Sequence, residues 1–406
     1  MSFNISNIRN DFPILKQRVY NKPLIYFDNG ATTHKPEVVI QTIRELQEQY
    51  NSSIHRGIHY LSDRMTERYE DAREKVRAFI NAGSVNEIIF TSGATGSINA
   101  VAFSFGEKHV KEGDEILITE LEHHSNLVPW QMLCERKGAR LKVIPIDDRG
   151  ELILDSMDDL MTDRTKILAV VHASNSLGTV NPVKEIIRRA HERNIPVLVD
   201  GAQMVQHGEV DVRDLDCDFY VFSSHKIFGP TGSGVLYGKE AWLEDLPPYQ
   251  GGGDMVDQVT FEKTTYNSLP FKFEAGTTNF TGAIGLGAAL EYVASIGIPG
   301  ISSYEEQLIR FTLEKLDGIR GLTLFGRARK RISVFSFLLE KIHPYDAGMI
   351  LDKMGIAVRT GTHCTQPVMD HFGITGTIRA SLVFYNTEEE VARFAEGLEK
   401  AIAMLS

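Results

Sequence analysis

The chain has 406 residues, of which 42% are hydrophobic and 24% are charged, which is enough for two or three domains with sizeable cores. It carries 43 lysine and arginine residues against 54 aspartate and glutamate residues, a formal net charge of -11, and no basic run interrupts it. This balance argues against nucleic acid as a partner.

The sequence contains no pattern typical of a secretion signal or a membrane helix. Residues 1–11 lack a basic flank followed by an apolar core, and no apolar run reaches the roughly 18 residues that a membrane helix needs. The three cysteines, Cys134, Cys217 and Cys364, have no CxxC spacing, so neither a disulfide framework nor a metal site is expected. We therefore expect a cytoplasmic protein with free thiols and no membrane partner.

Short apolar runs alternate with amphipathic stretches over residues 87–237, the pattern of βα units that form a mainly parallel sheet. Strands are predicted at 88–91, 115–118, 140–144, 167–172, 196–199, 218–223 and 234–237, with helices such as 96–111 and 183–193 between them. The sequence therefore predicts a doubly wound α/β domain.

Residues 246–281 depart from this pattern, with two adjacent prolines, a run of three glycines and little periodicity, and are predicted to form an ordered loop or an excursion rather than a core element. The chain then continues with helices predicted at 284–295, 304–316, 346–354 and 388–405, and with strands near 322–325 and 333–338. This mixture predicts a smaller α+β domain. The predicted boundaries are 1–25 for an N-terminal segment packed on the small domain, 26–295 for the large domain, and 296–406 for the small domain.

Polar residues follow several of the predicted strands, where open α/β sheets gather their ligands. The segment from Thr91 to Gly96 ends a strand and opens a helix, so that free backbone N–H groups and hydroxyls could bind an anion. Asp200 directly follows the strand predicted at 196–199, and Lys226 comes soon after the strand predicted at 218–223. A phosphate cradle, an acid for a pyridinium nitrogen and a lysine amine are the parts that pyridoxal phosphate (PLP) requires.

Six segments extend this set over nearly the whole chain. They are Tyr26-Phe27-Asp28-Asn29-Gly30-Ala31-Thr32-Thr33, His55-Arg56-Gly57-Ile58-His59, Glu122-His123-His124-Ser125-Asn126, Val199-Asp200-Gly201-Ala202-Gln203, the segment around Lys226, and Arg359-Thr360-Gly361-Thr362-His363-Cys364. With them the chain resembles the SufS-type cysteine desulfurases, which belong to the class V aminotransferases of PLP fold type I. The resemblance implies a large domain with a mainly parallel sheet and helices on both faces, followed by a smaller α+β domain.

The resemblance also implies a role for individual residues. Lys226 is expected to be the Schiff-base lysine, His123 to lie over the pyridine ring and move protons, and Asp200 to pair with the ring nitrogen. The other expected contacts are those of Asn175 and Gln203 with the ring hydroxyl, of Thr95, Ser223 and His225 with the phosphate, of Thr278 with the phosphate of a neighbouring subunit in a homodimer, and of Arg379, Asn175 and Arg359 with the substrate.

Cys364 indicates the reaction. A sulfur atom leaves cysteine only if something attacks it, and a second thiolate is the natural attacker. Arg359, Gly361 and His363 surround Cys364 with a loop expected to be flexible and electropositive, which favours a thiolate. Cys134 and Cys217 are instead expected to be small buried hydrophobes, and His124 and His363 to be structural. The predicted reaction converts L-cysteine to L-alanine and leaves a persulfide on Cys364.

The delivery of the sulfur follows from the short tether of Cys364. Five residues connect it to Arg359 and three to Pro367, which limits its reach to roughly 18 Å and 11 Å at about 3.3 to 3.6 Å per residue. A dedicated sulfur acceptor protein is therefore expected to enter the pocket. The resemblance implies an acceptor similar to SufE or SufU and use of the sulfur for iron–sulfur cluster assembly.

Two alternatives remain open. A different PLP enzyme of the same fold, such as a selenocysteine lyase, an epimerase or a kynureninase-like hydrolase, would keep Lys226 and Asp200 without needing Cys364. A non-catalytic subunit of a sulfur-transfer complex is the second alternative, but loss of Lys226 or Asp200 would mark it, and both are present.

Overall fold

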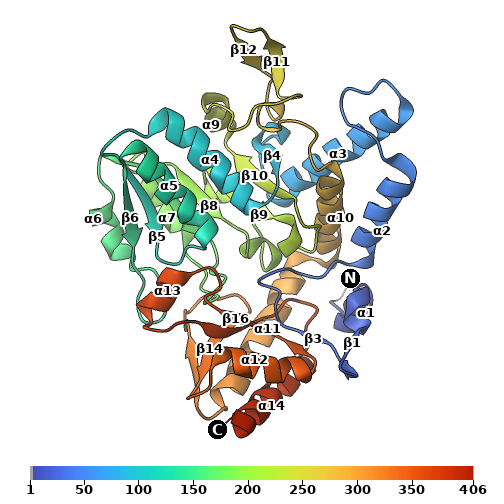
Figure 1. Cartoon of the computed structure of the whole chain (residues 1–406), viewed down its shortest axis with the longest axis vertical. Helices are drawn as coiled ribbons and strands as arrows, with labels where there is room; N and C mark the ends of the chain where they lie inside the picture. The colour runs from blue at the N-terminus through green and yellow to red at the C-terminus, as the bar shows by residue number, and fades with distance from the viewer. Residues whose placement is uncertain (1–2, 406) are drawn as a thin grey trace.

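The centre of the molecule is a seven-stranded sheet, seen in a computed structural model that describes residues 3–405 (Figure 1). Only β10 runs antiparallel to its neighbours, and all other adjacent pairs are parallel. The strand order is β4 (Ile88–Thr91), β10 (Gly234–Gly238), β9 (Phe219–Ser223), β8 (Val197–Asp200), β7 (Thr165–Val171), β5 (Glu115–Thr119) and β6 (Arg140–Ile144). The predicted α/β fold with a mainly parallel sheet is confirmed.

Helices cover both faces of this sheet because its inner strands are apolar on both sides. In β7, Leu168 and Val170 belong to one core and Ile167 and Ala169 to the other. The first core is closed by helices α3 (Tyr60–Phe79), α7 (Val183–His191) and α10 (Phe280–Ile296), and the second by α4 (Ala94–His109) and α5 (Val128–Lys137). The continuous apolar runs in the sequence thus correspond to buried strands.

A smaller, four-stranded antiparallel sheet lies below the first in Figure 1. Its order is β13 (Leu322–Phe325), β14 (Val334–Leu339), β17 (Thr377–Ser381) and β16 (Arg359–Gly361). Helices α11 (Ile298–Asp317), α12 (Pro344–Lys353) and α14 (Glu388–Leu405) pack on it around a separate apolar core. The small α+β domain therefore has a core of its own.

The N-terminal segment contacts both domains. Helix α1 (Ile5–Asn10) places Arg9 2.8 Å from Glu390 of α14, while Asp11 accepts a hydrogen bond from Tyr292 of α10. The chain then forms a small hairpin, β1 (Arg18–Val19) and β2 (Lys22–Pro23), and β3 (Ile25–Tyr26), which pairs with β15 (Ile356–Ala357). The boundaries at 25 and 295 stay predictions, and residues 1, 2 and 406 of the predicted domains lie outside the described residues.

The predicted loop at 246–281 contains regular structure. Strands β11 (Val256–Val259) and β12 (Thr264–Tyr266) pair as an antiparallel hairpin that projects from the top of the molecule in Figure 1. The segment is an excursion outside the core, as predicted, but the expectation of an irregular backbone is wrong for these two strands, which are rich in the valine, threonine and tyrosine favoured in sheets. The hairpin satisfies its backbone by pairing with itself, so it needs no buried face and leaves little periodicity in the sequence.

Shorter helices complete the two domains: α2 (Glu37–Glu45), α6 (Met157–Leu160), α8 (Val212–Leu215), α9 (Glu240–Asp245) and α13 (Gln366–His371). Within residues 3–405, no single helix is long and apolar enough to cross a membrane. Helices α10 and α11 reach that length only as a pair, and they meet at a 75° bend.

Candidate active site

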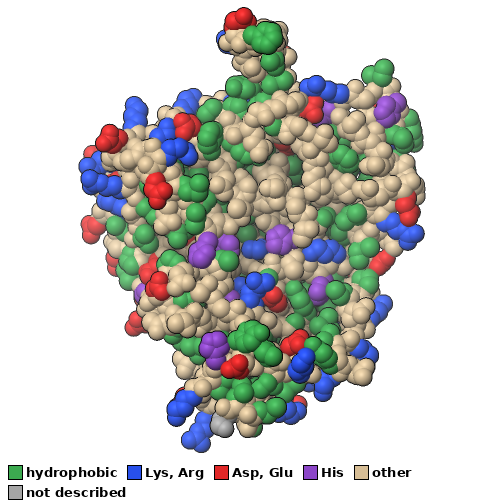
Figure 2. Space-filling view, viewed as in Figure 1, with side chains coloured by type: hydrophobic (Ala, Val, Ile, Leu, Met, Phe, Trp, Pro, Cys, Tyr) green, Lys and Arg blue, Asp and Glu red, His purple; other side chains and the backbone are tan. Residues whose placement is uncertain are grey.

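A pocket of about 240 Å³ lies between the carboxyl ends of the central strands and the small domain. The large domain contributes the turns after β4, β5, β7, β8 and β9, and the small domain contributes β16, β17 and the loop after β16. Ten of the predicted site residues line this pocket: Thr95, His123, Asn175, Asp200, Ser223, His225, Lys226, Arg359, Cys364 and Arg379. Figure 2 shows histidine and basic side chains gathered across the middle of this face, where the two domains meet.

Asp200 and Lys226 lie on the large-domain side of the pocket. Asp200 ends β8, is only 3% exposed, and accepts a hydrogen bond of 3.0 Å from the N–H of Ala202. Burial raises the pKa of Asp200, while Lys226 opposes the shift. Burial likewise lowers the pKa of the half-buried Lys226 amine, which Asp200 in turn raises. The pair therefore combines a buried acid with an amine that loses its proton more easily than an exposed lysine.

His123 lies in the turn after β5, and its ring has a defined tautomer. Its Nδ1 atom accepts a hydrogen bond of 3.0 Å from the N–H of Ser125. Because a backbone N–H can only donate, Nδ1 carries the lone pair and the proton of the neutral ring is on Nε2. Burial, followed by the charges of Lys226, His124 and Arg379, lowers the pKa of His123 to about 3. His123 is therefore a neutral hydrogen-bond donor through Nε2 at physiological pH.

Ser125 is a pocket residue to which the sequence analysis assigned no role. Its hydroxyl lies 2.7 Å from the hydroxyl of Thr95 and 3.0 Å from Nδ1 of His123, so it connects the predicted phosphate cradle to the predicted proton carrier. The signal was present in the sequence, because Ser125 belongs to the quoted segment that contains His123. Serine is too common in turns for that position alone to indicate a function.

The predicted phosphate cradle is the start of α4. Ser223, at the end of β9, accepts a hydrogen bond of 2.9 Å from the N–H of Ala94, and Thr95 follows in the first turn. A Cβ atom on Gly234 would lie 2.4 Å from Cα of Gly93, so β10 can pack against the cradle only because glycine has no side chain. The first N–H groups of a helix have no partner within the helix and favour an anion.

The pocket fits PLP because it contains buried polar atoms without a partner. Among the described residues, Oδ1 of Asn175 and Nδ1 of His225 make no hydrogen bond, and no hydrogen bond or ion pair holds the Lys226 amine. Burial, followed by Lys226 and Lys35, lowers the pKa of His225 to about 4. Lys226 would hold the cofactor covalently, Asp200 would meet the ring nitrogen, and the start of α4 would bind the phosphate.

Two predicted cofactor residues lie outside the pocket. Gln203 is buried, and its Nε2 donates a hydrogen bond of 2.8 Å to the carbonyl of Gly30, which lines the pocket. Thr278 lies in a separate cavity of about 170 Å³ with Phe90 and Tyr249. The fold of one chain therefore does not bring Thr278 to its own Lys226.

The small-domain side of the pocket contains two arginines. Arg379 of β17 is buried, donates a hydrogen bond of 3.0 Å to the carbonyl of Asn175, and has an Nε atom without a partner among the described residues. Arg359 of β16 is more exposed. Asn175 also donates a hydrogen bond of 2.7 Å to the carbonyl of His363, next to Cys364.

Cys364 is exposed at the pocket in the four-residue loop between β16 and α13. The backbone N–H of His124 donates to the Cys364 carbonyl at 2.8 Å, and the ring of His363 contacts the hydroxyl of Thr377 at 2.8 Å. His363 and Cys364 both have φ near +55°, at 55° and 58°, a backbone conformation that costs each residue about 1 kcal/mol. The loop is therefore held at several points by hydrogen bonds from neighbouring segments, which the sequence does not reveal, and its flexibility stays a prediction.

The other two cysteines are buried. Burial raises the pKa of the Cys134 thiol to about 11 and raises that of Cys217 as well. Neither lines the pocket, so only Cys364, among the described residues, offers a thiol there. No group of three or more histidine, cysteine, aspartate or glutamate side chains in residues 3–405 is arranged to hold a metal.

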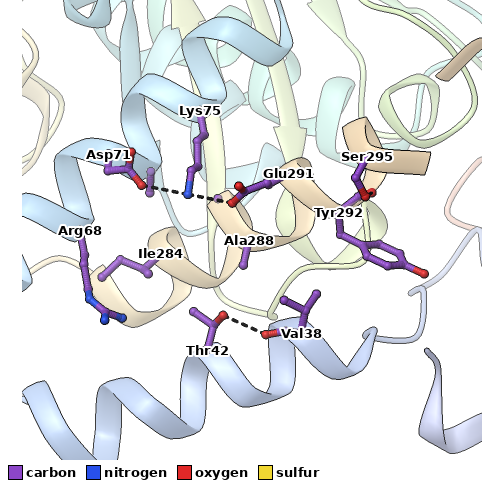
Figure 3. A pocket seen from close by; sticks show the side chains of 12 residues that line it. Val38, Thr42, Arg68, Asp71, Lys75, Ile284, Ala288, Glu291, Tyr292 and Ser295 are labelled. Carbon is purple, nitrogen blue, oxygen red and sulfur yellow. Dashed lines mark hydrogen bonds and ion pairs between the residues drawn. The ribbon is translucent and has the colours of Figure 1, made fainter. Parts of the chain in front are cut away.

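A larger groove of about 480 Å³ lies between α2, α3 and α10 (Figure 3). Lys75 lies between Asp71 and Glu291 at 2.9 and 3.0 Å, as the figure shows, so these charged groups already have partners. None of the predicted site residues lines this groove. The pocket around Lys226 is therefore the better candidate for an active site, since its polar groups converge and several lack partners.

Comparison with known proteins gives a consistent result. The aminotransferase class-V family matches residues 25–394. A cysteine desulfurase of Synechococcus elongatus is 51% identical over 98% of this chain, which spans 64% of that protein's length. A cysteine desulfurase of Escherichia coli O8 is 48% identical over the full length of both chains.

Solved structures agree. The Escherichia coli cysteine desulfurase CsdA, with an S-sulfonic acid, is 38% identical with a TM-score of 0.93 and coverage of 100% for both chains. A cysteine desulfurase from Thermococcus onnurineus, in its apo form, has the same identity and TM-score with 98% of each chain covered. Proteins of this family use PLP, which confirms the predicted cofactor. The chain belongs to the aminotransferase class-V family and, within it, to the cysteine desulfurases.

Proposed function

We propose that this protein converts L-cysteine to L-alanine and takes the sulfur as a persulfide on Cys364. The observation that carries the proposal is the position of Cys364, an exposed thiol that lines the same pocket as Lys226 from the opposite domain. The similarity to cysteine desulfurases over the whole chain supports it.

The sulfur step needs a nucleophile and an electron sink. PLP, when bound, withdraws electrons from the substrate so that its Cα–H and Cβ–S bonds can break. The Cys364 thiolate attacks the substrate sulfur, a new S–S bond forms, and the electron pair of the broken C–S bond stays with the substrate carbon. That carbon takes up a proton, so the products are L-alanine and the Cys364 persulfide, and no further oxidant or reductant is required.

The chain's other pocket residues hold the substrate and move protons. Arg379 has a free Nε–H for the substrate carboxylate, with which a guanidinium forms strong, oriented hydrogen bonds. Lys226, whose pKa burial lowers, can take up and return the proton at the substrate Cα. His123 lines the pocket and has Nε2–H available as a neutral donor.

The direct test is to incubate the PLP-loaded protein with L-cysteine and analyse the peptide that contains Cys364 by mass spectrometry. One additional sulfur atom on that peptide, together with one L-alanine per site, is expected. A modified Cys134 or Cys217 peptide, or alanine formation without any persulfide on Cys364, would contradict the proposal.

We further infer a SufS-type enzyme that passes its sulfur to an acceptor protein resembling SufE or SufU, for iron–sulfur cluster assembly. Support comes from the four-residue loop and from the hydrogen bond that the N–H of His124 donates to the Cys364 carbonyl, which keep the persulfide near the pocket. A persulfidated Cys364 cannot attack a second substrate. One L-alanine per site should therefore form without acceptor, and steady-state turnover should rise when acceptor is added; full turnover without acceptor or reductant would contradict this.

We infer a homodimer in which Thr278 completes the phosphate site of the partner subunit. Thr278 lies outside the pocket of its own chain, in a separate cavity lined in part by Phe90 and Tyr249. Sedimentation should show a dimer with two equivalent PLP sites, and a fully active monomer would disprove it.

We also infer a cytoplasmic location. The support is chemical, since Cys364 must remain a free thiol and all three cysteines are unpaired, which suits a reducing compartment. Cell fractionation with an antibody against the protein tests this, and recovery with the membrane or secreted fraction would disprove it.

A further inference from the structure

Asp28 connects two arginines that belong to different strands of the small domain. Its carboxylate lies 3.1 and 3.2 Å from Nε of Arg359 on β16, and 2.9 Å from Nη2 of Arg379 on β17. Asp28 itself follows β3, and its backbone bridges to Ser381 at the end of β17. Two positive charges and one negative charge thus meet beside the pocket and leave one net positive charge for one carboxylate.

The hydrogen bonds of Arg379 fix the orientation of its guanidinium. Nη2 is bound by Asp28 and Nη1 by the carbonyl of Asn175 at 3.0 Å. A Cβ atom on Gly30 would lie 3.2 Å from Cζ, so the backbone of Gly30 packs against the guanidinium. Because the group is planar, these contacts determine where its last nitrogen points. That nitrogen, Nε, is buried and has no partner among the described residues.

We propose that Asp28 is a positioning residue, which orients Arg379 so that its Nε edge receives the carboxylate of the substrate. The proposal rests on the proposed function, in which that substrate is an amino acid. Asp28 acts through Arg379 and does not touch the substrate. Asp28 also holds Arg359, which lies three residues before the loop that carries Cys364. It thereby keeps the position of Arg379, which binds the substrate carboxylate, constant relative to that loop.

Loss of Asp28 would have two effects of opposite sign. Removing the negative charge would make the pocket more attractive to any anion, which by itself would strengthen substrate binding. Removing the carboxylate would also leave the Arg379 guanidinium, which is only 2% exposed, without its charged partner, and a buried charge without its partner is strongly unfavourable in that position. Burial lowers the pKa of Arg379 and Asp28 opposes this, so the carboxylate stabilises the guanidinium where it lies. The loss of the Arg379 orientation should therefore weaken substrate binding more than the gain in positive charge strengthens it.

The test compares the wild-type holoenzyme with Asp28→Asn, which keeps the size of the side chain and removes its charge. KM for L-cysteine should rise about tenfold, the value of one well-oriented hydrogen bond to a charged group, while kcat stays within about threefold. The Kd of the product L-alanine, measured by calorimetry, should rise by the same factor. An unchanged or lower KM and Kd would show that Asp28 only balances charge, and would overturn the proposal.

A matched control is Asp317→Asn, which removes the same charge from an ion pair of 2.7 Å with Arg327, where both side chains are half exposed. Its KM and its L-alanine Kd should equal those of the wild type. If Asp317→Asn changed them as much as Asp28→Asn, the effect would be one of general charge and the proposal would fail.

Asp28→Glu separates position from charge, and it carries the test if Asp28→Asn does not fold. The variant keeps the carboxylate but moves it by one methylene, so L-alanine should again bind more weakly than to the wild type, and a crystal structure should show a rotated Arg379. Wild-type binding by this variant would overturn the proposal. L-alanine binding also separates the two hypotheses, since a wild type that binds L-alanine but does not consume L-cysteine would refute only the proposed function.

Discussion

The large-domain side of the pocket and the small-domain side are built in different ways. Asp200 and Lys226 lie at or just beyond the ends of neighbouring parallel strands, where the sheet itself determines their positions. Cys364 instead lies in a short loop held by hydrogen bonds from both domains, with two consecutive residues of positive φ. The comparison teaches that the cofactor chemistry depends on the sheet, whereas the sulfur chemistry depends on how the two domains meet.

Replacing Lys226 by alanine should have the largest effect, because it removes the amine that holds PLP. Activity should fall by about 10³-fold or more, and borohydride should no longer fix PLP to the protein. Absorbance of the purified protein and mass spectrometry after reduction measure this. If PLP were still linked covalently through another lysine, the role of the large-domain side would be assigned to the wrong residue.

Cys364→Ser should separate PLP binding, which depends on the large-domain side of the pocket, from sulfur removal, which depends on the small-domain side. The variant should bind PLP as the wild type does, because Cys364 belongs to the other domain, but sulfide release from L-cysteine should fall by about 10²-fold or more. Cys134→Ala is the matched control and should keep full activity, since that thiol is buried away from the pocket. Wild-type sulfide release by Cys364→Ser would indicate a different lyase, whereas survival of selenide release alone would agree with a desulfurase.

The free energy of unfolding of this protein should depend on pH through His172, a buried histidine of the large domain. Burial lowers the pKa of His172 to about 4, so an unfolded chain, with an ordinary histidine pKa of about 6.5, binds the proton more readily. The contribution of the neutral His172 ring to stability is then fully present above about pH 6.5 and is lost as the pH falls toward 4. When the pH is lowered from about 7.5 to about 5, the free energy of unfolding should fall by about 2 kcal/mol less in His172→Asn than in the wild type.

Urea unfolding of both holoenzymes at the two pH values measures this difference. Equal losses in the wild type and the variant would show that His172 does not titrate as a buried group. The side chain contacts the hydroxyl of Tyr220 at 3.0 Å, so some loss of stability at neutral pH is expected in addition and does not affect the comparison between pH values.

Lengthening the Cys364 loop should have the smallest effect. Two glycines inserted between Thr365 and Gln366 would loosen the loop where α13 begins, so the persulfide could leave the pocket more easily. The stimulation by an acceptor protein should fall by about two- to threefold. The same insertion after Gly373, beyond α13, is the control and should leave the stimulation unchanged; a loss of stimulation from both insertions would mean that the tether is not the cause.

Much of the fold could be predicted from local patterns. Short apolar runs match β4, β5, β7, β8, β9 and β10, because the central parts of strands that are covered on both faces must be apolar. Asp200 and Lys226 could be placed together for the same reason, since parallel strands end at one edge of a sheet. The hairpin of β11 and β12 was missed because a hairpin outside the core leaves no apolar periodicity.

The rest of the site was decided by tertiary structure. Asp28 meets Arg359 and Arg379 across 331 and 351 residues of sequence, and the backbone of His124 holds that of Cys364 from the other domain. Thr278, by contrast, lies away from the Lys226 of its own chain. Such contacts depend on how the small antiparallel sheet packs against the large domain, and this packing involves segments too far apart for any local period to encode. The sequence by itself determined which chemistry the residues can perform, and the packing of the two domains determined which of them stand together to perform it.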